Sequence, residues 1–245
     1  MQKKTAREIW SLLLAQYPEA HSTAVTVARG PPFEVLILTI LSAQTTDRAV
    51  LMVEESLFAK YPTPAALARA KITDVERIIH SLGFYHAKAR HIIAAAQAIL
   101  DEFGGHVPTT MEDLLKIPGV GRKTANIVLY HGHGRNEGIA VDTHVRRLAQ
   151  RIGFSDTDDV KVIEQDLMCL FPQDRWGDLT DLLIAHGRAC CTARTPACDR
   201  CPITRYCRYY RALRKKGAAI RSDGIKSKFL LQNAKSVFRC TGTGR

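Results

Sequence analysis

Four cysteines near the C-terminal end restrict what this chain can fold into more than any other feature of its sequence. They lie within 17 residues, separated by six, two and five residues, as Cys191, Cys198, Cys201 and Cys207. The chain has seven cysteines, and an odd number that is mostly clustered argues against the disulfide framework of a small secreted domain. Four thiolates this close in sequence can surround one metal centre, which on spacing alone is either an iron–sulfur cluster or a zinc ion.

The rest of the sequence has the periodicity of helices. Apolar residues recur three and four apart, with charged residues on the opposite face, in the segments 47–61, 74–82, 87–103 and 159–171. Residues 33–42 are apolar almost all round, which favours a buried central helix because no other strand signal accompanies them. The sequence therefore predicts an all-α fold. Its longest apolar run, about 35–41, is far shorter than the roughly 20 residues that cross a bilayer.

The net charge of +11 comes almost entirely from one end of the chain. Residues 208–245 carry eleven basic residues and one acidic residue, whereas residues 1–207 carry 24 basic and 23 acidic residues. A basic balance favours an anionic partner such as nucleic acid. The segment 213–245 is basic, contains glycine and serine and lacks helical periodicity, so we expect a flexible extension. Because the body is nearly neutral, this extension is expected to act as a separate, nonspecific tether to nucleic acid.

A glycine-containing turn is the first candidate for a phosphate-binding element. Residues 113–130 read as a short helix, a Pro-Gly-Val-Gly turn at 118–121, and a second helix that begins at Arg122. The two glycines let backbone N–H groups approach a ligand closely, and the following helix N-terminus favours negative charge. A plain turn between two core helices is the alternative, because short glycine motifs also arise by chance.

With three other stretches, this turn makes the chain resemble the helix–hairpin–helix DNA glycosylase superfamily and, within it, the endonuclease III family. The stretches are Leu-Ser-Ala-Gln-Thr-Thr-Asp at 41–47, Ile-Pro-Gly-Val-Gly-Arg-Lys-Thr-Ala at 117–125, Ala-Val-Asp-Thr-His at 140–144, and His-Gly-Arg at 186–188 before the cysteine array. They follow the order of the family and spread the resemblance over roughly residues 5–212. Only the C-terminal extension has no counterpart in the family pattern.

The resemblance implies two helical domains with duplex DNA in the cleft between them. The domain that contains the hairpin would span 24–134, and the iron–sulfur cluster domain would be assembled from 1–23 and 135–212. The extension at 213–245 would follow as a third part. The resemblance also makes a [4Fe–4S] cluster, held by the four clustered cysteines, the expected cofactor in place of zinc.

Two residues match the catalytic pair of the family. Lys123 matches the nucleophile: the helix N-terminus and partial burial would favour a neutral amine, which could attack the deoxyribose C1′ and form a Schiff base. Asp142 matches the catalytic aspartate, whose carboxylate would stabilise the positive charge that develops at C1′. Lys123 could instead be a solvated or phosphate-binding lysine, and Asp142 is also well placed to cap the helix that follows it.

Further matches predict contacts with DNA. Gln44 matches the residue that fills the space left by an extruded base, and Phe84 stands where the family often has a leucine wedge, with plain core packing as the alternative. His144 is expected to support Asp142. The basic residues of the cysteine loop, Arg194, Arg200 and Arg205, are expected to contact phosphates, with plain solvated surface charges as the alternative. The predicted DNA-binding residues are Gln44, Phe84, Pro118, Gly119, Val120, Gly121, Arg122, His144, Arg194 and Arg200.

Three residues near these motifs are expected to take no part in the chemistry. Cys190 is predicted to be a small buried residue and not an alternate metal ligand. His131 and His133 lie in a glycine-rich stretch without an acidic residue close by in the sequence, so we expect surface histidines.

The sequence thus predicts a bifunctional DNA glycosylase and abasic-site lyase that removes oxidised pyrimidines, of the thymine glycol type, in base excision repair. We expect a monomer that acts on damaged double-stranded DNA in the cytoplasm, at the nucleoid and away from membranes. A pyrimidine-dimer or mismatch glycosylase of the same fold is the nearest alternative, although a lysine at 123 argues against the monofunctional mismatch enzymes. A non-catalytic DNA-binding protein with a zinc module is the alternative of a different class.

Overall fold

The computed structural model describes residues 1–20 and 30–215, and the regular secondary structure of this part of the chain is helical. The helices up to the hairpin are α1 (Lys3–Gln16), α3 (Pro32–Leu41), α4 (Asp47–Lys60), α5 (Pro64–Ala68), α6 (Ile72–Ile78), α7 (Tyr85–Phe103), α8 (Met111–Leu114) and α9 (Arg122–Ile127). They are followed by η1 (Val128–Gly132), α10 (Thr143–Ile152), α11 (Val160–Leu170), η2 (Gln173–Arg175), α12 (Trp176–Ala189), η3 (Cys198–Arg200) and α13 (Arg208–Lys215). The predicted all-α fold is confirmed.

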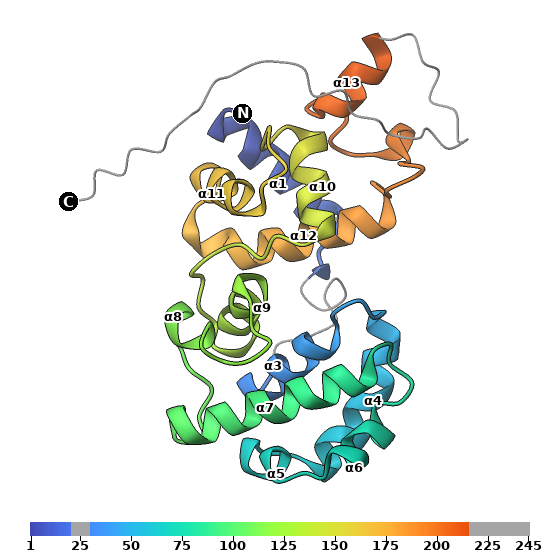
Figure 1. The fold of residues 1–245 in the computed structure, drawn as a ribbon. Coiled ribbons are helices and arrows are strands. Elements are labelled where there is room, and N and C mark those ends of the chain that lie inside the picture. Colours follow the sequence, from blue (N-terminus) through green and yellow to red (C-terminus); the bar gives the residue numbers. More distant parts are fainter. Residues whose placement is uncertain (21–29, 216–245) are drawn as a thin grey trace, which may run out of the picture.

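The helices form two groups (Figure 1). Helices α3 to α7 make one group, and α1 joins α10 to α13 in the other, while α8 and α9 lie between them (Figure 1). Each group encloses its own cluster of buried apolar side chains. Since α1 comes from the start of the chain, the second group is assembled from both ends of the sequence.

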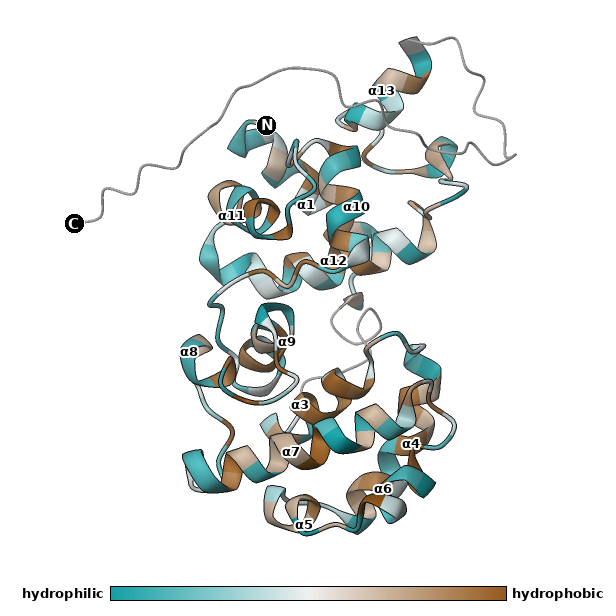
Figure 2. Cartoon of the chain, in the orientation of Figure 1, coloured by the Kyte–Doolittle hydropathy of each residue, from teal (hydrophilic) through white to brown (hydrophobic). Residues whose placement is uncertain are grey.

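Helix α3 is the centre of the first group. Eight of its ten residues are buried, and it is the most uniformly hydrophobic helix of this group (Figure 2). Pro32 starts the helix, where its missing N–H removes no intrahelical hydrogen bond. Each fully buried Leu or Ile side chain stabilises the fold by about 1.5–3 kcal/mol. The prediction of a buried central helix at 33–42 is confirmed.

The second group buries the apolar face of α1 against α10, α11 and α12. Ile9 and Leu13 are fully buried there, together with Leu148 and Leu182. These two clusters support the proposed division into a hairpin domain and a domain built from both chain ends. The proposed boundary at 23/24 lies outside the described residues, as does most of the proposed extension at 213–245.

The predicted helical segments agree closely with α4, α7 and α11, whereas α6 is displaced. It begins at Ile72 and ends at Ile78, before the predicted end at residue 82. Periodicity marks the buried face of a helix but does not mark its end. Here the chain turns after Ile79 to reach Phe84, which adopts a left-handed conformation and starts the next helix.

Polar contacts join the two groups where η1 meets α12. The Tyr130 hydroxyl donates to the Asp178 carboxylate, and His131 Nε2 lies 3.5 Å from Asp181 Oδ1. Gly177 lies against the Tyr130 ring, and a Cβ at that position would come within 2.2 Å of the ring Cγ. Only glycine therefore allows α12 to approach η1 this closely.

The prediction that His131 and His133 are surface residues is wrong. His131 belongs to η1 and is 5% exposed, with Asp181 beside it. His133 is half-buried, and burial lowers its pKa. The sequence shows no acidic neighbour for His131 because its partner stands fifty residues later, on α12.

No helix within residues 1–20 and 30–215 combines the length and the apolar character needed to cross a membrane.

Candidate active site and metal centre

The hairpin forms the predicted helix–turn–helix between α8 and α9. Thr110 caps α8 by accepting a hydrogen bond from the Asp113 N–H, and Gly119 adopts a left-handed conformation with φ of 83°. Val120 differs from the expectation for a ligand-binding residue. Its side chain is buried, and its N–H donates to the Ile117 carbonyl at 3.1 Å. The turn therefore uses Val120 internally and presents Gly119 and its exposed neighbours Pro118 and Gly121 to solvent.

Lys123 is the second residue of α9 and therefore lies at the helix N-terminus, as predicted. Its expected partial burial is wrong, because Lys123 is exposed. The apolar contacts of this segment are made by Val120 and Ala125, which point into the first core and leave Lys123 facing outward. The Lys123 amine is therefore accessible to a large substrate.

Arg122 is bound to a carboxylate that sequence reasoning did not single out. Its Nε donates to Glu164 Oε2 at 2.5 Å, and this hydrogen bond raises the pKa of the guanidinium. The Glu164 side chain is only 4% exposed, and its Oε1 accepts a hydrogen bond from Asn126 Nδ2 at 2.9 Å. These contacts fasten the first turns of α9 to α11. Glu164 looks like one more charge on an amphipathic helix in the sequence, so its role has no local signal.

Asp142 is the N-cap of α10. Its Oδ1 accepts a hydrogen bond from the Val145 N–H at 2.8 Å, so the capping role considered from the sequence is confirmed. His144, two residues along, contacts Arg147 through Nδ1 at 3.1 Å, and burial lowers the pKa of His144. Arg147 in turn donates to the Cys191 carbonyl at 3.0 Å. The helix that carries Asp142 is therefore held directly by the cysteine loop.

Gln44 and Phe84 share an unusual conformation. Among the residues that the structure describes, they are the only non-glycine residues with positive φ, at 53° and 58°. Both are exposed, and 70% of the Phe84 surface is accessible. The alternative that Phe84 is a core residue is therefore wrong. Backbone strain at residues with exposed side chains is typical of functional sites, and each such residue costs roughly 1–3 kcal/mol.

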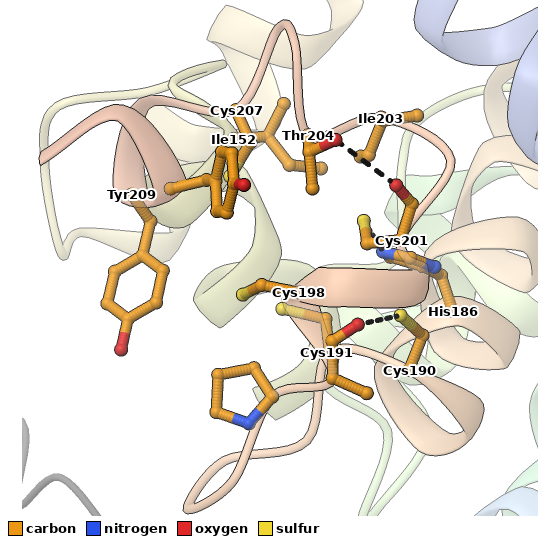
Figure 3. Close-up of a pocket in the computed structure, with 13 residues that line it drawn as sticks. Ile152, His186, Cys190, Cys191, Cys198, Cys201, Ile203, Thr204, Cys207 and Tyr209 are labelled. Carbon is orange, nitrogen blue, oxygen red and sulfur yellow. Dashed lines mark hydrogen bonds between the residues drawn. The ribbon is translucent and has the colours of Figure 1, made fainter. Parts of the chain in front are cut away.

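The four predicted metal ligands line one pocket (Figure 3). The cysteine loop and η3 form its wall, and Ile152 and Ile203 add apolar surface. All four cysteines have free thiols. Burial raises the pKa of Cys198 to about 11 and also raises the pKa of Cys201 and of Cys207. Only a bound metal centre would hold such thiols as thiolates near neutral pH.

The spacing of the four thiols bears on the choice between a cluster and a single ion. Four thiolates around one zinc ion, with bonds of about 2.3 Å, would stand within about 4 Å of one another. No three of these cysteines approach within 4.8 Å of one another; the group of the described residues that does so is His186, Cys190 and Cys201. A cluster, in which each thiolate binds a different iron atom, fits the wider arrangement.

Arg151 and His186 complete the surroundings of the cysteines. Arg151 is 6% exposed and donates from Nη1 to Cys191 Sγ at 3.4 Å, where its charge can compensate a thiolate. His186 Nε2 lies 3.6 Å from Cys201 Sγ, while its Nδ1 meets the Tyr17 hydroxyl at 3.0 Å. Burial lowers the pKa of His186 to about 4, so its ring is neutral. Neither contact could be inferred from sequence spacing.

The other residues singled out in and beside the cysteine loop are three exposed arginines and one buried cysteine. Arg194, Arg200 and Arg205 are exposed, and Arg200 also donates to the Ala189 carbonyl at 3.3 Å. Cys190 is 6% exposed and its thiol donates to the Ala197 carbonyl at 3.4 Å. Cys190 is thus a small buried residue, as predicted.

Comparison with known proteins gives the same assignment. Residues 37–173 match the HhH-GPD superfamily of base excision DNA repair proteins, and residues 191–207 match the iron–sulfur binding domain of endonuclease III. Endonuclease III of Synechocystis sp. is 45% identical over 205 residues, which cover 84% of this chain and 92% of that protein. These matches exclude the alternative of a non-catalytic protein with a zinc module.

Comparison with solved structures supports the same family assignment. A trapped endonuclease III–DNA covalent intermediate is 37% identical, with a TM-score of 0.80 over 86% of this chain and 98% of that one. A thermostable thymine-DNA glycosylase shares the fold, with a TM-score of 0.77 over 86% of this chain and 98% of that one at 22% identity, and this likeness concerns the fold alone. The chain therefore belongs to the HhH-GPD superfamily of base excision DNA repair proteins, as a DNA glycosylase and abasic-site lyase of the endonuclease III family with an iron–sulfur cluster.

Proposed function

We propose that this enzyme removes oxidised pyrimidines of the thymine glycol type from duplex DNA and then cleaves the strand, with Lys123 as the nucleophile. The observation that carries the proposal is the exposed amine of Lys123 in the first turn of α9, directly after the hairpin. A substrate as large as duplex DNA can reach an amine only if it stands at the surface. The trapped covalent intermediate of a related endonuclease III supports the same chemistry.

In the proposed reaction the neutral Lys123 amine attacks C1′ of the damaged nucleotide. The bond from C1′ to the base breaks, and its electron pair leaves with the base, which takes up a proton. Loss of the amine protons and opening of the sugar ring give a Schiff base between Lys123 and C1′. Removal of a proton from C2′ then breaks the C3′–O bond and releases the phosphate, and water hydrolyses the Schiff base to free the amine.

Asp142 would assist at C1′. Because Oδ1 is fixed by the Val145 N–H, the carboxylate has one orientation, with Oδ2 left to face the sugar. A fixed negative charge there would stabilise the positive charge that develops as the base leaves, and the carboxylate could accept a proton from Lys123. Capping and catalysis are therefore compatible roles for the same side chain.

Binding of duplex DNA would depend on a few placed groups. The exposed turn at Gly119 and Gly121 offers backbone N–H groups to a phosphate, and Arg194 and Arg200 offer charge from the cysteine loop. Arg122, anchored to Glu164 through Nε, would reach a phosphate with its terminal nitrogens.

Extrusion of the damaged base from the duplex costs a few kcal/mol of stacking and pairing free energy. Side chains inserted into the vacated space offset part of this cost. Gln44 would fill the space left by the base, and Phe84 would separate the neighbouring base step. Their exposure supports this assignment, because an insertion residue has to project from the surface.

The cysteines Cys191, Cys198, Cys201 and Cys207 would hold the [4Fe–4S] cluster. When bound, the cluster supplies a cross-link that joins four points of the loop. The arginines of the loop are then fixed relative to α10 and α12, which Arg147 already connects through its hydrogen bonds to the carbonyls of Cys191 and Gly187.

We also propose that the enzyme acts as a monomer at the nucleoid. Sedimentation of the protein with a short lesion-containing duplex would show a one-to-one complex, and a two-to-one complex would contradict the proposal.

A panel of lesions tests the substrate class. Single-turnover excision would be measured on duplexes with thymine glycol, dihydrouracil, thymine opposite guanine, or a pyrimidine dimer. We expect the two oxidised or reduced pyrimidines to be excised at least about tenfold faster than the other two, with strand cleavage. Fastest excision of the dimer, or base release without strand cleavage, would replace the proposal with the corresponding alternative.

A further inference from the structure

Lys88 on α7 is a buried lysine that the proposed chemistry does not use. The residue is 4% exposed, and burial lowers the pKa of its amine. A buried charged group is strongly unfavourable unless hydrogen bonds compensate its lost hydration. The Lys88 amine makes such a bond, since Nζ donates to the Thr45 hydroxyl.

Thr45 transmits this contact to the turn that carries Gln44. The Thr45 hydroxyl donates to the Ala43 carbonyl at 3.3 Å, and the Thr45 N–H donates to the Ser42 carbonyl at 3.2 Å. The Lys88 amine therefore anchors the residue directly after Gln44.

The backbone of Lys88 holds the other insertion segment. Its N–H donates to the Phe84 carbonyl at 3.0 Å, which is the first hydrogen bond of α7. One residue is thus bonded to the Phe84 turn through its main chain and to the Gln44 turn through its side chain.

The turns at Gln44 and Phe84 are the two places where a residue other than glycine has positive φ among the described residues. Positive φ at a residue other than glycine persists only where the surroundings impose it. The exposed side chains of Gln44 and Phe84 cannot supply that restraint, so it has to come from contacts made by neighbouring residues.

We propose that Lys88 is a positioning residue that couples the Gln44 turn to the Phe84 turn, so that both side chains meet the duplex at a fixed separation. The inference rests on the proposed function to the extent that Gln44 and Phe84 enter DNA. It assigns a role to a residue that neither reacts nor touches the substrate.

Three variants isolate the hydrogen bond. Lys88→Met removes the donor but keeps an unbranched apolar stem, and Thr45→Val removes the acceptor while it preserves the side-chain shape. Thr45→Ser is the matched control, because it retains the hydroxyl. Thermal unfolding of each purified, cluster-containing protein would report any general loss of stability.

The decisive measurement is the ratio of two single-turnover rates. One is excision of thymine glycol from a duplex, which requires insertion into DNA; the other is cleavage of an abasic site in a single-stranded oligonucleotide, which requires only the Lys123 chemistry. We expect the ratio to fall at least about tenfold in Lys88→Met and Thr45→Val, and less than about twofold in Thr45→Ser. If Lys88→Met fails to fold, the comparison of Thr45→Val with Thr45→Ser decides.

An unchanged ratio in Thr45→Val would overturn the role of Lys88 and leave the proposed function intact. A parallel loss of both rates would also overturn it, because it would indicate damage to the fold or to the nucleophile. Failure of the wild-type enzyme to excise thymine glycol would instead reject the proposed substrate. Fluorescence of 2-aminopurine opposite the lesion gives a second readout, and its rise on binding should be smaller in Thr45→Val than in Thr45→Ser.

Discussion

Asp142 shows how one side chain can serve both the fold and the reaction. Capping α10 through the Val145 N–H stabilises the helix by about 1 kcal/mol and also fixes the carboxylate. A carboxylate that stabilises charge in a transition state needs such a fixed orientation. Both roles therefore depend on the same geometry, and a substitution that preserves the cap can separate them.

Asp142→Asn is that substitution. Asn caps a helix as well as Asp does, so we expect thermal stability and DNA affinity to change little. The excision rate should fall by about a hundredfold or more, because the negative charge at C1′ is lost. Single-turnover rates and binding titrations on the same duplex would measure both quantities. Equal losses of rate and affinity would show that Asp142 acts through structure alone.

For single residues, the sequence predicts which residues belong to the site better than it predicts how exposed each one is. The motif at 117–125 places Lys123 at a helix N-terminus, and the structure agrees. Its exposure was not predictable, because which side of a six-residue helix faces the core depends on distant contacts. His131 shows the same limit, since its buried environment is created by Asp181 on another helix.

At the scale of helices, the buried carboxylate of Glu164 on α11 holds the start of α9. Glu164 on α11 accepts hydrogen bonds from Arg122 and Asn126 of α9, and from the Ile139 N–H at 3.3 Å. A Cβ at position 138 would approach Glu164 Oε1 to 2.4 Å, so Gly138 is required for this contact. Lys123 stands beside Arg122, and its place at the site is therefore set partly by α11.

Glu164→Gln should lower the free energy of unfolding by about 2–4 kcal/mol. The amide keeps only one acceptor oxygen and turns an NH2 donor toward the donors that Glu164 binds, namely Arg122, Asn126 and the Ile139 N–H. Asp158→Asn is the matched control. It removes the carboxylate that binds Arg146, in a pair with side-chain exposures of 45% and 56%, and should change stability by less than about 1 kcal/mol. Urea denaturation of both variants would test this; similar losses would contradict the assigned role of Glu164.

Helices themselves were largely predictable, because amphipathic periodicity is a local property. The segments 47–61, 87–103 and 159–171 correspond to α4, α7 and α11. The contacts that organise the site were not predictable, since Glu164, Arg151 and Lys88 look in the sequence like ordinary charges on helix surfaces.

Across the whole molecule, the cysteine loop closes the second group of helices. Cys198, Cys207 and Tyr209 form a small buried cluster of their own with Leu213 beside it, separate from the two large cores. So small an apolar cluster supplies little stability by itself. The iron–sulfur centre is therefore expected to hold residues 191–215 in place, much as metal holds other small domains.

Loss of iron should unfold this part selectively. Cys198→Ser should lack the absorbance of an iron–sulfur centre and show rapid hydrogen exchange in α13, while the amides of α3 and α7 remain protected. Cys190→Ser is the matched control and should keep its iron, because Cys190 is assigned no ligand role. Iron loss in Cys190→Ser, or slow exchange in α13 of Cys198→Ser, would contradict the account.

Covalent trapping tests the central claim, that Lys123 is the nucleophile, most directly. Borohydride reduces a Schiff base to a stable amine, so wild-type enzyme on a thymine glycol duplex should give a protein–DNA adduct that survives denaturation. Lys123→Gln should give none, although it should still bind the duplex. Peptide mapping of the wild-type adduct should place the reduced sugar on Lys123. Persistent trapping in Lys123→Gln, or an adduct on another residue, would contradict the account.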